Sequence, residues 1–297
     1  MADERNCIYV ASRGLLKSCD IRSPKPRSSG QTELNYLYDL HKHPFDGMTV
    51  YVCTDNLPTF AVVFLPHIKH QFVLVSGDSD ESLKQSPITE VILNHPMLVR
   101  WFAQNNLCPR VTHLPIGLDF HTIAENANHP WCAKGEGASP LQQQHYLMQV
   151  RDKARCWTER SKLIYAQFTL NNDAFGQRAA CLRAIPPNLM HHVLNFTTRT
   201  QCWNNMAEHA FVLCPAGNGL DCHRNWEAMA LSCIPIMLRQ PGFSDLYAGL
   251  PVLLVDDWAD VTLELLDSTL ADFTRRAWNM SKLSAKYWLN QLHEMRS

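Results

Sequence analysis

The stretch from residue 211 to residue 238, FVLCPAGNGLDCHRNWEAMALSCIPIML, constrains the fold more than any other part of the chain. The apolar run 211–213 predicts a buried strand, and a proline and two glycines break it within the next six residues. Asp221 is a candidate N-cap for a helix that begins at Cys222. A proline ends that helix, and 234–238 reads as a second buried strand. The sequence therefore predicts a strand–loop–helix–strand unit, which is typical of parallel α/β folds.

The loop of this unit has the features of a phosphate site. Backbone N–H groups at the start of a helix lack intrahelical partners, and the helix dipole adds positive character there. Gly217, Gly219 and Asp221 are therefore candidate donor-binding residues, together with Arg224, whose planar guanidinium suits phosphate oxygens. Glu227 follows on the same helix face and could accept two ribose hydroxyls. Alternatively, Arg224 and Glu227 form an ordinary ion pair on the helix surface. The loop matches neither GxGxxG nor a P-loop.

This stretch resembles the C-terminal half of exostosin-like glycosyltransferases (glycosyltransferase family 47). Their pattern is roughly a hydrophobic strand followed by P-x-G-x-G-x-D-[ST]-x-R-x-x-E-A-[LM]-x-x-G-C-I-P-V. The residues of this chain in that register are Pro215, Gly217, Gly219, Asp221, Arg224, Glu227, Ala228, Met229, Cys233, Ile234 and Pro235. Cys222 stands where Ser or Thr is usual, and Ser232 replaces a Gly. The chain resembles a short soluble member of this family. The resemblance implies a two-domain nucleotide-sugar transferase whose C-terminal domain binds most of the donor.

Composition narrows the class of protein further. The chain has 297 residues, enough for two domains. Its net charge of −1 provides no basic excess for nucleic acid. The eleven cysteines are scattered without a CxxC pair and favour buried thiols in a reducing compartment. No apolar run is long enough for a transmembrane helix, and the charged start of the chain has no signal-peptide pattern. These features predict a soluble, cytoplasmic protein without a membrane span.

Alternating strands and helices predict an α/β fold of two Rossmann-like domains facing a cleft, as in GT-B type glycosyltransferases. Residues 1–157 are expected to form the acceptor-side domain and residues 158–297 the nucleotide-sugar domain, with the last helix crossing back to the first. In the first domain the patterns predict strands at 5–10, 48–54, 71–76 and 111–116, and helices at 33–41, 90–105 and 141–157. In the second domain they predict further strands at 162–168, 191–196 and 252–255. They also predict a helix that contains Arg178 and ends at 185, a helix at 201–208, and a helical pattern from 263 to 295.

Asp78 and Asp80 follow the predicted strand 71–76 directly. Ligands collect at the carboxyl ends of strands in open α/β sheets. Three interpretations compete for this pair. One carboxylate could be the general base that takes the proton of an acceptor hydroxyl, with Asp78 preferred over Asp80. The pair could instead bind a divalent cation, or Asp80 could cap a short helical turn.

Three more charged residues are candidates by position. Asp119 follows the predicted strand 111–116 and could line the acceptor side, although a plain turn residue fits equally. In exostosin relatives a basic residue in or after the first βα loop of the second domain contacts the donor phosphates, which implicates Arg178, with Arg160 as second choice. Each of these arginines could also be an ordinary surface residue. Phe243 and Trp258 are candidates for stacking on the uracil base.

These observations together predict an inverting transfer of a sugar from a UDP-sugar to the hydroxyl of a glycan or oligosaccharide. No histidine pair has the spacing of a strong zinc motif, so we expect no cofactor and no essential metal. Fixed positive groups would then assist departure of UDP. The alternatives are a metal-dependent transferase that uses 78–80, and a non-catalytic protein that binds glycans or nucleotides on the same scaffold.

Overall fold

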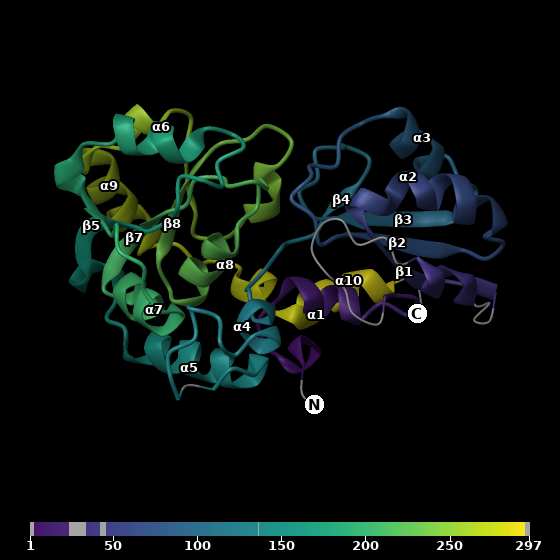
Figure 1. Ribbon diagram of the computed structural model, residues 1–297. Helices are drawn as coiled ribbons and strands as arrows, with labels where there is room; N and C mark the ends of the chain where they lie inside the picture. The colour runs from purple at the N-terminus through teal and green to yellow at the C-terminus, as the bar shows by residue number, and fades with distance from the viewer. Residues whose placement is uncertain (1–2, 24–33, 42–45, 136, 295–297) are drawn as a thin grey trace.

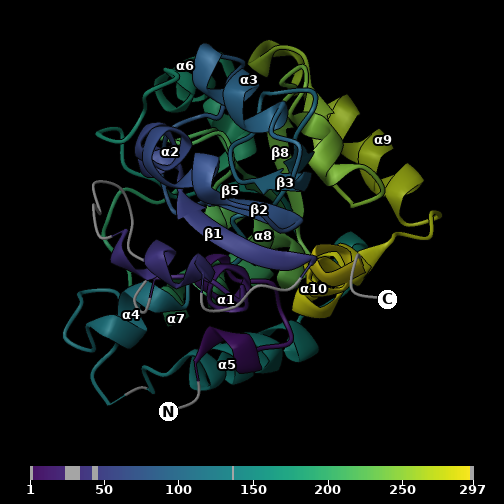
Figure 2. The same ribbon diagram turned by 90° about the vertical axis from the view of Figure 1, so that its right-hand side faces the viewer.

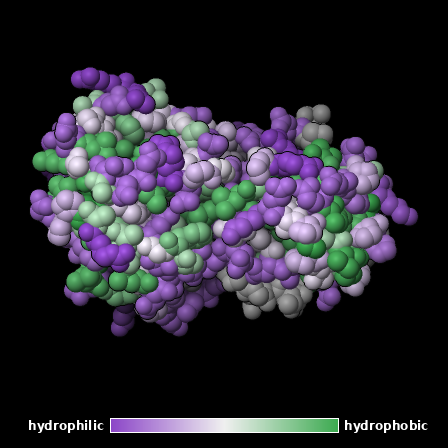
Figure 3. Space-filling view, turned by 90° about the horizontal axis from the view of Figure 1, so that it is seen from above, coloured by the Kyte–Doolittle hydropathy of each residue, from purple (hydrophilic) through white to green (hydrophobic). Residues whose placement is uncertain are grey.

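The structure is a computed structural model that describes residues 3–23, 34–41, 46–135 and 137–294. It contains two separate parallel sheets flanked by helices (Figure 1). Seen from above, the molecule has two lobes that meet at a narrower waist (Figure 3). The predicted fold class, α/β with two Rossmann-like units, is therefore confirmed.

The first sheet has the strand order β1-β2-β3-β4, with all pairs parallel. Its strands are β1 (Met48–Cys53), β2 (Phe72–Gly77), β3 (Leu98–Ala103) and β4 (Thr112–His113). The α-helices in this half of the chain are α1 (Ser12–Lys17), α2 (Leu57–Thr59), α3 (Pro87–Leu93), α4 (His121–Glu125) and α5 (Pro140–Lys153). Both β1 and β2 are buried throughout, as expected for strands covered on both faces.

Two sequence predictions in this half are wrong, and a third differs from the structure in helix type. The expected strand 5–10 begins with the 3-10 helix Glu4–Asn6, and beyond it Tyr9 makes only an isolated bridge. The expected helix 90–105 is α3 followed by β3, because the chain turns at 94–97 and the apolar residues after it are buried on both faces of a strand. The short helix expected at 33–41 is present as a 3-10 helix, Asn35–His41; residue 33 lies outside the described residues.

The second sheet has the order β6-β5-β7-β8-β9 and is also parallel. Its strands are β5 (Ser161–Ala166), β6 (Met190–His192), β7 (His209–Leu213), β8 (Ile234–Leu238) and β9 (Leu253–Val255). Its helices are α6 (Gln177–Ala184), α7 (Arg199–Ala207), α8 (His223–Ala230), α9 (Leu263–Phe273) and α10 (Ala285–His293). One hydrophobic cluster joins one sheet face to α6 and α9, and another joins the opposite face to α5, α7 and α8.

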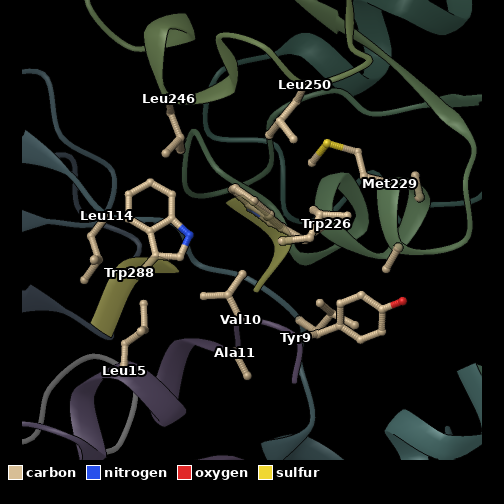
Figure 4. Close-up of a cluster of buried hydrophobic side chains, with 14 of the residues drawn as sticks. Tyr9, Val10, Ala11, Leu15, Leu114, Trp226, Met229, Leu246, Leu250 and Trp288 are labelled. Atoms are coloured by element: carbon tan, nitrogen blue, oxygen red, sulfur yellow. The ribbon is translucent and has the colours of Figure 1, made fainter. Parts of the chain in front are cut away.

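The last helix returns to the first half of the chain. Helix α10 packs beside α1 (Figure 2). Just before it, the Val10 N–H donates to the Leu283 carbonyl at 2.8 Å, and the Ala285 N–H donates to the Ile8 carbonyl at 2.8 Å. The same hydrophobic cluster contains Trp288 of α10 and Trp226 of α8 (Figure 4). The two sheets therefore share a core at the waist.

Two further features concern the expected domain division and the compartment. Helix α5 precedes the expected boundary at 157 but packs against α7 of the second unit. All eleven cysteines are free thiols, and most are buried. Among the described helices, none combines the length and apolar character that a membrane crossing requires.

Candidate functional site

The glycine loop connects β7 to α8, as the sequence predicts, but Asp221 is not the N-cap of α8. Cys222 occupies that position, without a side-chain capping bond. The Asp221 carboxylate is buried and accepts hydrogen bonds from Trp226 Nε1 at 2.9 Å and Tyr247 OH at 2.6 Å. It also accepts one from the Ile116 N–H of the first unit at 2.8 Å. Because these donors occupy both oxygens, the structure does not bring Asp221 to an open ligand site.

Two arginines converge beside the glycine loop. The guanidinium carbon of Arg178 lies 5.9 Å from the centre of the Phe168 ring, and that of Arg224 lies 5.3 Å from it. Arg178 Nη1 also donates to the Thr169 carbonyl at 2.7 Å. Phe168 follows β5, α6 carries Arg178 and α8 carries Arg224, so the sheet order places them at one carboxyl edge.

These guanidiniums have no carboxylate within ion-pair distance in the part of the chain that the structure describes. Among the described residues, neither Arg178 nor Arg224 has an ion-pair partner, and Arg178 Nε and Arg224 Nη1 are buried without a hydrogen bond. Burial and then the nearby Arg224 charge lower the pKa of Arg178. Two cations held together against their repulsion form a site for an anion.

Gly217 and Gly219 allow neighbouring side chains to lie directly against the backbone of the glycine loop. A Cβ atom on Gly217 would lie 2.4 Å from Arg178 Nη2, closer than van der Waals contact. A Cβ atom on Gly219 would lie 2.8 Å from Nδ2 of Asn105, a residue of the first unit. The loop therefore carries glycine where side chains of both units reach its backbone.

Glu227 lies one turn after Arg224 on α8 and is 9% exposed. No hydrogen bond or ion pair to its carboxylate occurs within the described part of the chain, so the alternative of a surface ion pair with Arg224 is not observed. A buried carboxylate without a protein partner leaves its hydrogen-bonding capacity for a ligand.

Arg160 lies at the opposite end of the sheet. It directly precedes β5, and its side chain donates to the carbonyls of Arg155 at 2.6 Å and Leu231 at 3.3 Å. The structure therefore does not bring Arg160 to the glycine loop, because the amino and carboxyl ends of parallel strands lie at opposite edges of a sheet. Phe243 and Trp258 are buried within the hydrophobic clusters, which leaves Phe168 as the aromatic ring beside the two arginines.

Asp78 follows β2 and is 6% exposed, with a φ of +58° that is unusual for a residue other than glycine. Its Oδ1 lies 3.8 Å from Arg13 Nε, and its Oδ2 is buried without a hydrogen-bond partner. Burial raises the pKa of Asp78 to about 6, and the Arg13 charge opposes that rise. A carboxylate with this pKa is suited to accept a proton near neutral pH.

Asp80 differs from Asp78 in exposure and in its contacts. It is exposed, and its Oδ2 accepts a hydrogen bond at 3.3 Å from Asn218 Nδ2 of the glycine loop. The short helical turn that Asp80 was expected to cap is absent from residues 81–84. Within the described ranges, no three His, Cys, Asp or Glu side chains are grouped so that they could hold a metal ion.

Asp119 is buried and engaged on both carboxylate oxygens. Its Oδ2 accepts from Arg199 Nη2 at 2.8 Å, and its Oδ1 lies 3.2 Å from His121 Nδ1. Although burial alone would raise the pKa of Asp119, the Arg199 charge outweighs it and holds that pKa well below its usual range. Asp119 therefore anchors Arg199 and orients His121, instead of presenting a free carboxylate.

Sequence reasoning missed several residues at this junction. Asn105, with a φ of +48°, donates from Nδ2 to the Ser79 carbonyl at 3.1 Å and accepts at Oδ1 from the Asp221 N–H at 2.9 Å. It thereby joins the loop after β2 to the glycine loop. Arg13, His121 and His223 also face this region, and no local motif marks them in the sequence; Gly-Leu-Asp before His121 is the nearest signal.

A separate cavity of about 350 Å³ lies between α5 and α7. Its walls include Tyr146, Trp203 and Arg199. None of the residues from the glycine loop or the loop after β2 lines it, so it is distinct from the site described above.

No protein-family model matches this chain, and no curated protein matches it. Among solved structures, an α,α-trehalose-phosphate synthase (UDP-forming) from Burkholderia vietnamiensis is similar to it, with 10% sequence identity and a TM-score of 0.39. That match covers 88% of this chain and 74% of the other.

Proposed function

We propose that this chain is a glycosyltransferase that uses a nucleotide sugar, with UDP as the nucleotide. The observation that carries the proposal is the pair Arg178 and Arg224, which lie on one aromatic ring beside a glycine loop without a carboxylate partner in the described residues. A diphosphate bound there would neutralise both guanidiniums. The resemblance of residues 211–238 to exostosin-like transferases supports the same assignment.

The neighbouring residues supply the rest of the donor site. Glu227, one turn further along α8, would accept the ribose hydroxyls with its unpaired carboxylate. Phe168 would hold the two guanidiniums in place through its ring face. The positive charge of Arg178 and Arg224 would stabilise the negative charge that develops on the departing UDP, so that no metal ion is required for this step.

Asp78 would act as the general base on the acceptor side. Its unpartnered Oδ2 would take the proton of an acceptor hydroxyl while that oxygen bonds to the anomeric carbon. The bond between the anomeric carbon and the phosphate oxygen breaks in the same step, and UDP leaves with the electron pair. A single displacement of this kind inverts the anomeric centre. The acceptor that fits this chemistry is a glycan or oligosaccharide hydroxyl.

The binding half of this proposal is tested by calorimetric titration with UDP in EDTA, with GDP as the comparison ligand. We expect UDP to bind the wild type. Arg224→Ala should weaken UDP binding by about tenfold or more, because a hydrogen bond to a charged group contributes about 1.5–3 kcal/mol. The matched control is Arg183→Ala, which removes an exposed arginine from the last turn of α6.

Full UDP affinity in Arg224→Ala would overturn the phosphate assignment. Binding that appears only when Mn²⁺ is added would instead support Asp78 and Asp80 as metal ligands. The catalytic half is tested with UDP-sugars and oligosaccharide acceptors. Asp78→Asn should bind UDP but lose transfer, whereas loss in Asp80→Asn alone would make Asp80 the base. UDP binding without transfer to any acceptor would identify a non-catalytic binding protein.

A further inference from the structure

Two histidines from different units face one another at the junction. His121 lies at the start of α4 and His223 at the start of α8. Their ring centroids are 5.8 Å apart, with an interplanar angle of 61°. The contact thus joins α4, which follows the last strand of the first sheet, to α8, the helix that carries Arg224. Neither ring has a role in the phosphate site described above.

The contacts of each ring fix where its proton lies. His121 Nδ1 is 3.2 Å from the Asp119 carboxylate, and His223 Nδ1 is 2.7 Å from the Gly117 carbonyl. Both partners can only accept, so each Nδ1 must carry the hydrogen. In the neutral rings the lone pair is therefore on Nε2. No hydrogen bond to either Nε2 is present among residues that the structure describes.

A third acceptor belongs to the same place. The Asp78 carboxylate, with its buried and unpartnered Oδ2, is close enough to His223 for an electrostatic interaction, as His121 is to Asp119, Arg13 and His223. Burial lowers the pKa of His121 to about 4, so that this ring is neutral near pH 7. Three hydrogen-bond acceptors therefore converge where the two units meet.

The chemistry of these acceptors selects the ligand. The Asp78 carboxylate would repel an anion. A cationic ligand is disfavoured as well, because the guanidinium of Arg13 already lies 3.8 Å from that carboxylate. A neutral molecule that presents several hydroxyl donors satisfies all three acceptors. His223 directly precedes Arg224, so both side chains lie at the same end of α8.

We propose that His121 and His223 bind hydroxyl groups of the transferred sugar through Nε2, and so determine which sugar the site accepts. This inference rests on the proposed function. The sugar ring lies between the diphosphate at Arg224 and the base Asp78, and the two histidines hold it from both units. Asp119 and Arg199 are positioning residues, because they act on the sugar only through the orientation of His121.

The test compares UDP with UDP-glucose, UDP-galactose, UDP-xylose and UDP-N-acetylglucosamine by calorimetry. His121→Asn and His223→Asn each keep an N–H donor near the Nδ1 position but have no group at Nε2. We expect UDP affinity to stay within about twofold in both variants, while affinity for the best UDP-sugar falls about fivefold, as for loss of one neutral hydrogen bond. The matched control is His145→Asn, on the exposed face of α5.

The ratio of UDP-sugar affinity to UDP affinity distinguishes a failure of the proposed function from a failure of the histidine assignment. A wild type that binds no UDP would overturn the proposed function, and this inference with it. Normal UDP binding together with an unchanged ratio of UDP-sugar to UDP affinity in both variants would overturn the histidine assignment alone. Should one variant fail to fold, as judged by its thermal melt, the other variant decides. A change in which UDP-sugar binds best would support the role in sugar selection directly.

Discussion

Asp78 should destabilise the native protein at neutral pH, and Asp78→Asn should therefore raise stability while it removes the base. Burial raises the pKa of Asp78 from its ordinary value of 3.8 to about 6. Each pH unit of difference between folded and unfolded states corresponds to about 1.36 kcal/mol, so keeping this carboxylate ionised in the folded protein costs about 3 kcal/mol. Asn also tolerates the left-handed backbone at this position better than most residues.

The direction of the Asp78 pKa shift determines how the stability difference between the two proteins changes with pH. Because the folded pKa is the higher one, the folded state holds the proton more tightly than the unfolded chain. The contribution of Asp78 to stability is therefore most favourable below pH 3.8 and is lost as pH rises through about 6. The advantage of Asp78→Asn over the wild type should be about 3 kcal/mol at pH 8 and should fall below about 1 kcal/mol near pH 4.

Urea unfolding of both proteins at pH 4, 6 and 8 measures this difference. The control is Asp80→Asn, an exposed neighbour whose substitution should change the free energy of unfolding by no more than about 0.5 kcal/mol. A variant that is less stable than the wild type at pH 8 would refute the reasoning, since it would show that the Arg13 contact stabilises Asp78 by more than burial costs. An advantage that is equal at all three pH values would refute it as well.

Two further predictions concern buried contacts. Asp119→Asn should lower the free energy of unfolding by about 3–5 kcal/mol, because it leaves the Arg199 guanidinium buried beside a neutral partner; urea unfolding measures this, and a loss below about 1 kcal/mol would contradict it. Gly219→Ala should weaken UDP binding without abolishing folding, because the new methyl group displaces Asn105 and with it the glycine loop; unchanged UDP affinity in calorimetry would contradict this.

Local signals located most elements of the second unit, although β6 ends at His192 and the helical pattern of 263–295 is divided into α9 and α10. β8 spans the predicted residues 234–238, which form a short apolar run, but the proline expected to end the preceding helix lies inside this strand, and α8 ends earlier, at Ala230. In the first unit the same reasoning failed at 90–105, where Leu98, Trp101 and Phe102, at helical spacing, belong to the strand β3, whose last three residues are all buried. Such a strand has no alternation that would distinguish it from a buried helix. The prediction for 5–10 failed because its buried residues, Cys7, Tyr9 and Val10, are covered by tertiary contacts and do not belong to a sheet.

The candidate site was only partly predictable, because its members meet through sheet order. Arg178 and Arg224 were identified individually, but their convergence on Phe168 depends on β5 lying beside β7. Asp221 was assigned to a helix cap from its local position, whereas its actual partners include an N–H group of the first unit. His121 and His223 lie far apart in the sequence, and no periodicity or motif relates them.

The phosphate loop and the proposed base belong to one packed structure and not to two independent modules. Asn105 fixes the Asp221 N–H on one side and the Ser79 carbonyl, next to Asp78, on the other. The core at the waist, which contains Trp226 and Trp288, holds α8 against the segments that flank α1. Separation of the chain near residue 157 would expose that core and break the hydrogen bond between Asn105 and the Asp221 N–H. Donor binding and proton transfer therefore depend on the same set of buried contacts between the units.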